Sequence, residues 1–109
     1  MSESSRLEKG NGGQVERIVV ILNRYGLHAR PAAEFVKLSS TFKAKVTVEK
    51  EGLEVNGKSI MGVMMLAAEC GSTLKLRAVG DDADEALEAL ATRVSERFGE
   101  TESDYEIEN

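Results

Sequence analysis

The sequence predicts an α+β fold in which an antiparallel sheet carries helices on one face. Two stretches, residues 44–49 and 73–78, alternate apolar with polar residues, as half-buried strands do. Two others, residues 32–38 and 86–98, place apolar residues at helical spacing. Taken along the chain, the patterns predict a strand, a helix, two strands, a short helix, a strand and a final helix, without internal repeats.

The first strand and the first helix meet near His28. Residues 18–22 form an unbroken run of β-branched residues and leucine, which is typical of a strand. The apolar period changes to a helical one after it. Pro31 favours a helix that begins just before it, because proline is preferred in a first turn. Gly26 permits a sharp turn ahead of the helix. His28 is therefore expected at or just before a helix N-terminus.

The middle of the chain predicts a hairpin. Residues 44–49 alternate as one strand, Leu53 and Val55 form a shorter one, and Lys50-Glu51-Gly52 closes the turn between them. Ser59 precedes the apolar stretch 60–68 and is expected to cap a short helix through its hydroxyl group.

The last two elements are a strand and the clearest helix. Residues 73–78 alternate, and Asp82 is expected to cap the following helix together with Glu85. Gly99 offers a C-terminal stop. One face of this helix is apolar, and its members are Ala86, Leu87, Leu90, Ala91, Val94 and Phe98.

The chain of 109 residues fits one domain, which we expect to span residues 15–99. Residues 1–14 are polar and glycine-rich and are expected to form a flexible tail. Residues 100–109 hold five acidic and no basic side chains and are expected to form an acidic tail. This segment accounts for the whole net charge of −5, so the remainder is balanced.

Composition excludes several classes of function. A balanced domain with few aromatic residues does not predict nucleic-acid binding. The single Cys70 excludes an internal disulfide and is expected to pack in a small buried space. One histidine and one cysteine cannot supply a usual metal site, and no cofactor is expected. Without a secretory pattern or a long apolar run, the expected location is the cytoplasm, with no membrane insertion.

Chemistry is expected at His28, the only histidine of the chain. Unpaired N–H groups and aligned peptide dipoles make a helix N-terminus attractive to anions. Arg30 adds a planar guanidinium suited to phosphate oxygens. The same field disfavours an imidazolium ring, so His28 should be neutral and nucleophilic near pH 7. The sequence therefore predicts reversible phosphorylation of His28.

This chemistry requires an exposed ring nitrogen and a helix tip that no internal carboxylate occupies. The alternative is a purely structural role, in which His28 caps the helix or fills a turn. A hydrolytic triad is not indicated, since no serine lies on a nucleophile elbow.

The stretch Gly26-Leu27-His28-Ala29-Arg30-Pro31-Ala32-Ala33, followed by residues 56–64 (NGKSIMGVM), closely resembles the HPr family. These are phosphocarrier proteins of the bacterial phosphoenolpyruvate-dependent phosphotransferase system, and the likeness runs from about Val15 to Phe98. The resemblance implies an open-faced β-sandwich with a four-stranded antiparallel sheet and three helices.

The resemblance also implies roles for particular residues. His28 would accept a phosphoryl group on Nδ1 from Enzyme I and pass it to an Enzyme IIA-type acceptor domain, with Arg30 binding the phosphate. Ser59 matches a serine that a dedicated HPr serine kinase/phosphorylase modifies in some members. Residues 60–68 are apolar on all sides, so part of this segment should face solvent. Its docking side would carry Ile60, Met61 and Met64, whereas Val63 and Leu66 are expected in the core.

The expected function is thus that of a carrier for sugar uptake, a covalent intermediate rather than an enzyme. One alternative is a nitrogen-related (NPr-like) regulatory phosphorelay, because residues 64–68 and the acidic turn 80–82 resemble that branch more closely than the sugar-dedicated carriers. Another is a partner-binding regulator. We expect a monomer.

Overall fold

The computed structural model describes residues 8–9 and 13–101. Its sheet has the strand order β1-β2-β5-β3-β4, and all neighbours are antiparallel. The strands are β1 (Glu8–Lys9), β2 (Gln14–Val20), β3 (Lys45–Lys50), β4 (Leu53–Asn56) and β5 (Thr73–Val79). The α+β prediction is confirmed, and β2 to β5 are the four expected strands. The two-residue β1 at the edge is an addition that the sequence did not predict.

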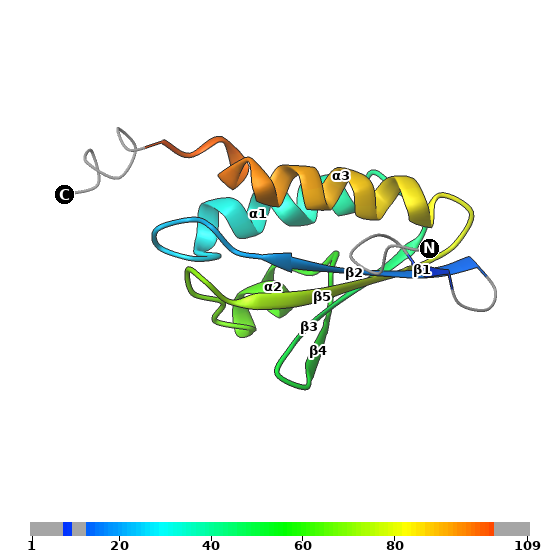
Figure 1. Cartoon of the computed structure of the whole chain (residues 1–109), viewed down its shortest axis with the longest axis horizontal. Coiled ribbons are helices and arrows are strands. Elements are labelled where there is room, and N and C mark those ends of the chain that lie inside the picture. Colours follow the sequence, from blue (N-terminus) through cyan, green and yellow to red (C-terminus); the bar gives the residue numbers. More distant parts are fainter. Residues whose placement is uncertain (1–7, 10–12, 102–109) are drawn as a thin grey trace.

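Three α-helices accompany the sheet: α1 (Ala29–Ser39), α2 (Ile60–Met65) and α3 (Ala83–Ser95). Figure 1 shows α1 and α3 lying side by side over one face of the sheet. The shorter α2 packs against α1 and β4. A short 3-10 turn, Arg97–Gly99, follows α3.

One continuous apolar core lies between the sheet and its helices. Alternate residues of β2, β3 and β5 point into it, as the strand periodicity predicts. Phe35 of α1 is its largest fully buried side chain. Burial of each such side chain stabilises the fold by about 1.5–3 kcal/mol. The helices add Ala32, Val63, Leu66, Leu87, Leu90 and Val94.

The expected tails, residues 1–14 and 100–109, lie mostly outside the described residues. Within the described part, Glu8–Lys9 pairs with β2, and Gln14 is the first residue of β2. Glu100 is buried, with 7% of its surface exposed. The folded unit thus includes residues that the sequence pattern assigned to both tails.

Asp82 precedes α3 as predicted, but the prediction that its side chain caps this helix is wrong. Its side chain makes no cap hydrogen bond to α3. Instead, the carboxylate accepts the backbone N–H groups of Lys43 and Ala44, each at 2.8 Å, just before β3. Both amides lie before the first residue of β3, and each donates to a different oxygen of the carboxylate. Asp82 therefore joins the start of α3 to the start of β3.

This clamp predicts a pH-dependent stability. The backbone N–H of Lys43, and then that of Ala44, holds the pKa of Asp82 below its ordinary value of 3.8. A lowered folded pKa stabilises the fold above the unfolded pKa, and the contribution is lost as pH falls through the folded value. Asp82→Asn should therefore unfold more easily than wild type near neutral pH, and the difference should shrink in acid. Urea denaturation across this range measures it.

Asp81→Asn is the matched control, because Asp81 is the exposed neighbour of Asp82. It should follow the wild-type curve at every pH. A stability difference for Asp82→Asn that stayed constant with pH would contradict the clamp.

Candidate functional site

The loop before α1 is tied down at Gly26 and Leu27. Gly26 has a φ of +70°, a conformation that side-chain-bearing residues rarely adopt. Its N–H donates to the carbonyl of Asn23 at 3.0 Å, and the N–H of Leu27 donates to the carbonyl of Ala68 at 2.8 Å. Leu27 is buried in the core. The loop is therefore anchored on both sides of the turn, which fixes the position of the next residue, His28.

His28 is the N-cap of α1, as the sequence predicts. Its backbone is extended, with φ −76° and ψ −173°, and its side chain makes no cap hydrogen bond. Its carbonyl accepts the N–H of Ala32 at 2.9 Å. The first turn of α1 contains no acidic residue. The positive end of the helix dipole thus acts on the imidazole without a neighbouring carboxylate in that turn.

The imidazole ring of His28 is partly exposed, with 28% of its side-chain surface accessible. Tyr25 meets it edge to face, with ring centroids 6.3 Å apart. Nε2 lies 3.0 Å from Oε2 of Glu100. Within residues 8–9 and 13–101, no hydrogen bond to Nδ1 is found. The two ring nitrogens of His28 therefore have different surroundings.

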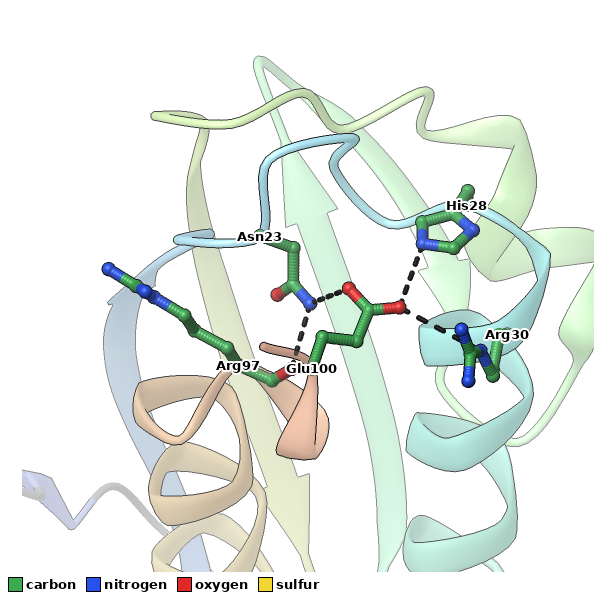
Figure 2. Close-up of polar contacts among 5 residues, drawn as sticks. All are labelled: Asn23, His28, Arg30, Arg97 and Glu100. Atoms are coloured by element: carbon green, nitrogen blue, oxygen red, sulfur yellow. Dashed lines mark hydrogen bonds and ion pairs between the residues drawn. The ribbon is translucent and has the colours of Figure 1, made fainter. Parts of the chain in front are cut away.

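Glu100 is the residue that the sequence analysis missed. Only 4% of its side-chain surface is exposed. Oε1 accepts a hydrogen bond from Nδ2 of Asn23 at 2.6 Å, and Oε2 contacts His28. Figure 2 shows the carboxylate between Asn23 on one side and His28 with Arg30 on the other. The sequence analysis expected no internal carboxylate at the N-terminal tip of α1. This expectation is wrong on the Nε2 side of the His28 ring, where the carboxylate of Glu100 lies.

The turn after α3 brings Glu100 to this place. Arg97, Phe98 and Gly99 have φ values of 57°, 52° and 77°, so three successive residues are left-handed. Such conformations cost roughly 1–3 kcal/mol for each residue other than glycine and persist only where the surroundings enforce them. Here Phe98 is buried, and the N–H of Glu100 donates to the carbonyl of Arg97 at 2.9 Å. The sequence pattern placed the C-terminal stop at Gly99, but α3 ends at Ser95, and periodicity gives no sign of the reversal that follows.

Arg30 lies at the second residue of α1, with 57% of its side-chain surface exposed. Its Nε is 3.9 Å from Oε2 of Glu100. The guanidinium therefore lies on the same side of the helix tip as the imidazole, as expected (Figure 2). The sequence motif was sufficient to predict that His28 and Arg30 lie close together, because they are two residues apart at the start of α1.

The second motif is also placed as expected. Ser59 is the N-cap of α2, and its hydroxyl accepts the N–H of Gly62 at 3.0 Å. Val63 and Leu66 are buried. The remaining large side chains of the helix are exposed, with Met61 the most exposed at 72%. We call these exposed residues the α2 surface: Ile60, Met61, Met64 and Met65. The bond between Leu27 and Ala68 joins the end of the α2 segment to the His28 loop.

Three further observations bear on other kinds of site. Within the described part of the chain, no group of three or more His, Cys, Asp or Glu side chains could hold a metal ion. Cys70 is exposed, with Sγ 3.7 Å from the carbonyl oxygen of Leu22, so the prediction of buried packing is wrong. In the same described residues, every helix is too short or too polar to span a bilayer.

Comparison with known proteins places this geometry in a family. The model of the PTS HPr component phosphorylation site matches residues 15–96, which include both motifs. Phosphocarrier protein HPr of Cupriavidus necator is 46% identical over 88 residues, covering 81% of this chain and 99% of that protein. The crystal structure of HPr from Thermoanaerobacter tengcongensis is 48% identical, with a TM-score of 0.77, over 79% of this chain and 97% of that one.

A second crystal structure from the same organism is of an HPr dimer. It is 49% identical, with a TM-score of 0.65, and covers 75% of this chain and 94% of that one. These identities extend over nearly the full length of the relatives, so the likeness is not limited to one motif. The chain belongs to the HPr family and is a phosphocarrier of the phosphoenolpyruvate-dependent phosphotransferase system.

Proposed function

We propose that His28 is the residue of this phosphocarrier that bears the phosphoryl group, on Nδ1. The observation that carries the proposal is the asymmetry of the ring. Nε2 is engaged by Glu100, while Nδ1 has no hydrogen-bond partner within the described residues, at the N-cap of α1. A neutral imidazole whose proton lies on Nε2 presents a lone pair at Nδ1. That lone pair is the nucleophile.

The transfer step balances without a proton leaving the ring. The lone pair of Nδ1 forms a bond to phosphorus while the bond between phosphorus and the donor atom of Enzyme I breaks. A PO3⁻ group is thereby moved, and Nε2 keeps its hydrogen throughout. The product is a positively charged ring that bears a dianionic phosphoryl group. In a second step the phosphoryl group passes from Nδ1 to an Enzyme IIA-type acceptor, and the neutral imidazole is restored. The protein therefore acts as a covalent intermediate rather than an enzyme.

Two features would stabilise the phosphoryl group on Nδ1. The N-terminal field of α1 favours an anion by about 0.3–1 kcal/mol per charge. The guanidinium of Arg30, next to the ring, can donate charge-assisted hydrogen bonds to the phosphoryl oxygens, each worth roughly 1.5–3 kcal/mol. Arg30 is therefore proposed to bind the phosphate.

The partners follow from membership of the family. Enzyme I is the proposed donor and Enzyme IIA-type domains for sugar uptake are the proposed acceptors. We propose that residues 15–99, with Glu100, form the working unit, and that it acts as a monomer in the cytoplasm. The regulatory alternative has no particular support, because phosphocarrier HPr proteins that are 46% and 44% identical match this chain over 99% of their own length.

An acceptor assay distinguishes a carrier from a regulator. The phosphorylated protein is purified away from Enzyme I and mixed with an isolated Enzyme IIA domain, and the phosphoryl content of both is followed with time. A carrier loses its phosphoryl group as the acceptor gains one. Loss to solvent without gain by any acceptor domain would contradict the proposal.

The α2 surface is proposed to dock against both partners. It is apolar, and methionine side chains adapt to more than one contact surface. The docking residues proposed on it are Ile60, Met61 and Met64. The Leu27–Ala68 bond joins this segment to the loop that carries His28, so a protein bound here would lie near the reacting nitrogen.

Met61→Glu or Met64→Glu is therefore expected to reduce transfer from Enzyme I about tenfold or more, because a carboxylate would be buried in an apolar interface. Transfer rates and thermal unfolding are measured together. Val79→Glu is the control: Val79 is 38% exposed, close to the 42% of Met64, but lies at the far end of β5, paired with Gln14. Normal transfer by both methionine variants would contradict the docking assignment.

Ser59 is proposed as a regulatory phosphorylation site for a dedicated serine kinase. It immediately precedes the α2 surface, so a phosphate there would place a dianion beside the proposed interface. Ser59→Asp should slow transfer from Enzyme I about tenfold. Ser59→Asn retains a good N-cap without charge and is the matched control. Equal rates for the two variants would contradict the regulatory role.

A further inference from the structure

The contact between Glu100 and His28 is part of a buried hydrogen-bond network. Its carboxylate is buried, and each oxygen has a defined partner: Nδ2 of Asn23 at 2.6 Å and Nε2 of His28 at 3.0 Å. Asn23 is itself fully buried. An ionised carboxylate accepts hydrogen bonds and cannot donate one, so the nitrogen that faces it must carry the hydrogen.

The orientation of Asn23 is fixed by two acceptors. Nδ2 donates to Oε1 of Glu100 and to the carbonyl oxygen of Arg97 at 2.9 Å. Turning the amide over would place Oδ1 against both oxygens, which would repel it. Oδ1 is buried with no hydrogen-bond partner within the described residues, as this orientation requires. Asn23 therefore fixes the position of the Glu100 carboxylate. Its second hydrogen bond, to the carbonyl oxygen of Arg97, stabilises the turn that precedes Glu100.

We propose that Glu100 is a positioning residue that keeps the hydrogen of neutral His28 on Nε2 and so leaves Nδ1 as the only nucleophilic nitrogen. This inference deepens the proposed function and rests on it for its role in transfer. Glu100 acts through the ring and does not touch the phosphoryl group. The same carboxylate would stabilise the positive charge that the ring gains when Nδ1 takes a PO3⁻ group.

The backbone supports a dedicated arrangement. Arg97 and Phe98 hold left-handed conformations that side-chain-bearing residues avoid, and Gly99 continues them. An ordinary helix end needs only one left-handed residue, commonly glycine. The additional reversal, with Phe98 buried beneath it, directs the chain back to the start of α1. Its outcome is the contact between Glu100 and His28.

The direct test is the tautomer of His28 in the full chain labelled with ¹⁵N-histidine. Long-range ¹H–¹⁵N spectra in mildly alkaline buffer distinguish a protonated from an unprotonated ring nitrogen. Wild type should show about a tenfold or greater excess of the Nε2–H form. Glu100→Ala should shift the ring towards the mixture of forms that a free imidazole shows.

Two further variants separate hydrogen bonding from general structure. Glu100→Gln should lose much of the Nε2–H form, because Nδ2 of Asn23 takes its one amide oxygen and its NH2 group, a donor, then faces Nε2. Glu96→Gln, an exposed residue of the same turn, should match wild type. A wild-type ring with its hydrogen on Nδ1, or a tautomer ratio unchanged in Glu100→Ala, would overturn the inference.

A chemical readout uses phosphoramidate, a small donor that needs no partner protein. Wild type should be labelled on Nδ1, whereas Glu100→Ala should also be labelled on Nε2. Labelling of Nδ1 alone in both proteins would count against Glu100. If instead the tautomer depends on Glu100 but Enzyme I fails to phosphorylate His28, the proposed function fails while the positioning role stands.

Discussion

His28→Ala is expected to abolish phosphorylation by phosphoenolpyruvate and Enzyme I. Nδ1 of His28 is the nucleophile in the proposed transfer, and the chain has no second histidine to replace it. The loss should leave the fold intact, since the ring is partly exposed and makes no cap hydrogen bond to α1. Radiolabel from phosphoenolpyruvate, tested for stability in base and lability in acid, measures it.

Arg30→Ala provides a graded companion to this variant. It keeps the nucleophile but removes the proposed phosphate-binding guanidinium, so labelling should continue at a rate roughly 10- to 100-fold lower. Glu96→Ala, which removes an exposed charge at the end of α3, should be labelled normally. Equal labelling of His28→Ala and wild type would disprove the assignment of the phosphoryl acceptor.

Gly26→Ala is expected to have the largest effect on stability. The φ of +70° at Gly26 costs a side-chain-bearing residue about 1–2 kcal/mol. In addition, a Cβ atom there would overlap the carbonyl oxygen of Ala68 and lie 2.9 Å from Cα of Glu69. That carbonyl accepts the hydrogen bond of Leu27, so relief of the overlap would break the anchor. We expect a loss of about 3 kcal/mol or more, measured by urea unfolding.

Gly52→Ala isolates the conformational part of this loss. Gly52 also has a positive φ, +88°, but a Cβ atom added to it would meet nothing within 4 Å. Its cost should therefore be limited to about 1–2 kcal/mol. Similar losses for the two variants would show that the contact with Ala68 contributes nothing, and would contradict the proposed anchoring of the His28 loop.

Local patterns predicted the elements well, because each depends on residues that are neighbours in the chain. Alternation identified β3 and β5, and helical spacing identified α1 and α3. Capping chemistry placed Ser59 and His28 at the starts of their helices. The division of the α2 segment into buried Val63 and Leu66 and exposed methionines was also confirmed. The family resemblance implied the open-faced β-sandwich, and the order of the strands came only from the structure, since periodicity carries no information on which strands pair.

Contacts between distant segments escaped the sequence analysis. Asp82 was expected to cap its own helix, but the amides of Lys43 and Ala44 bind its carboxylate instead. The sequence analysis assigned Glu100 to an acidic tail because acidic residues are frequent in the segment that follows it, residues 101–109. Its burial depends on the left-handed turn before it and on Asn23, which is 77 residues away in the chain. Neither contact leaves a periodic signal, so only the fold reveals them.

The most direct test of the central claim is the location of the phosphoryl group. The full chain is incubated with phosphoenolpyruvate and Enzyme I, its intact mass is recorded, and the modified nitrogen is assigned by NMR under alkaline conditions. The account predicts one added phosphoryl group per chain, on Nδ1 of His28. A phosphoryl group on any other residue, or on Nε2 of His28, would contradict it.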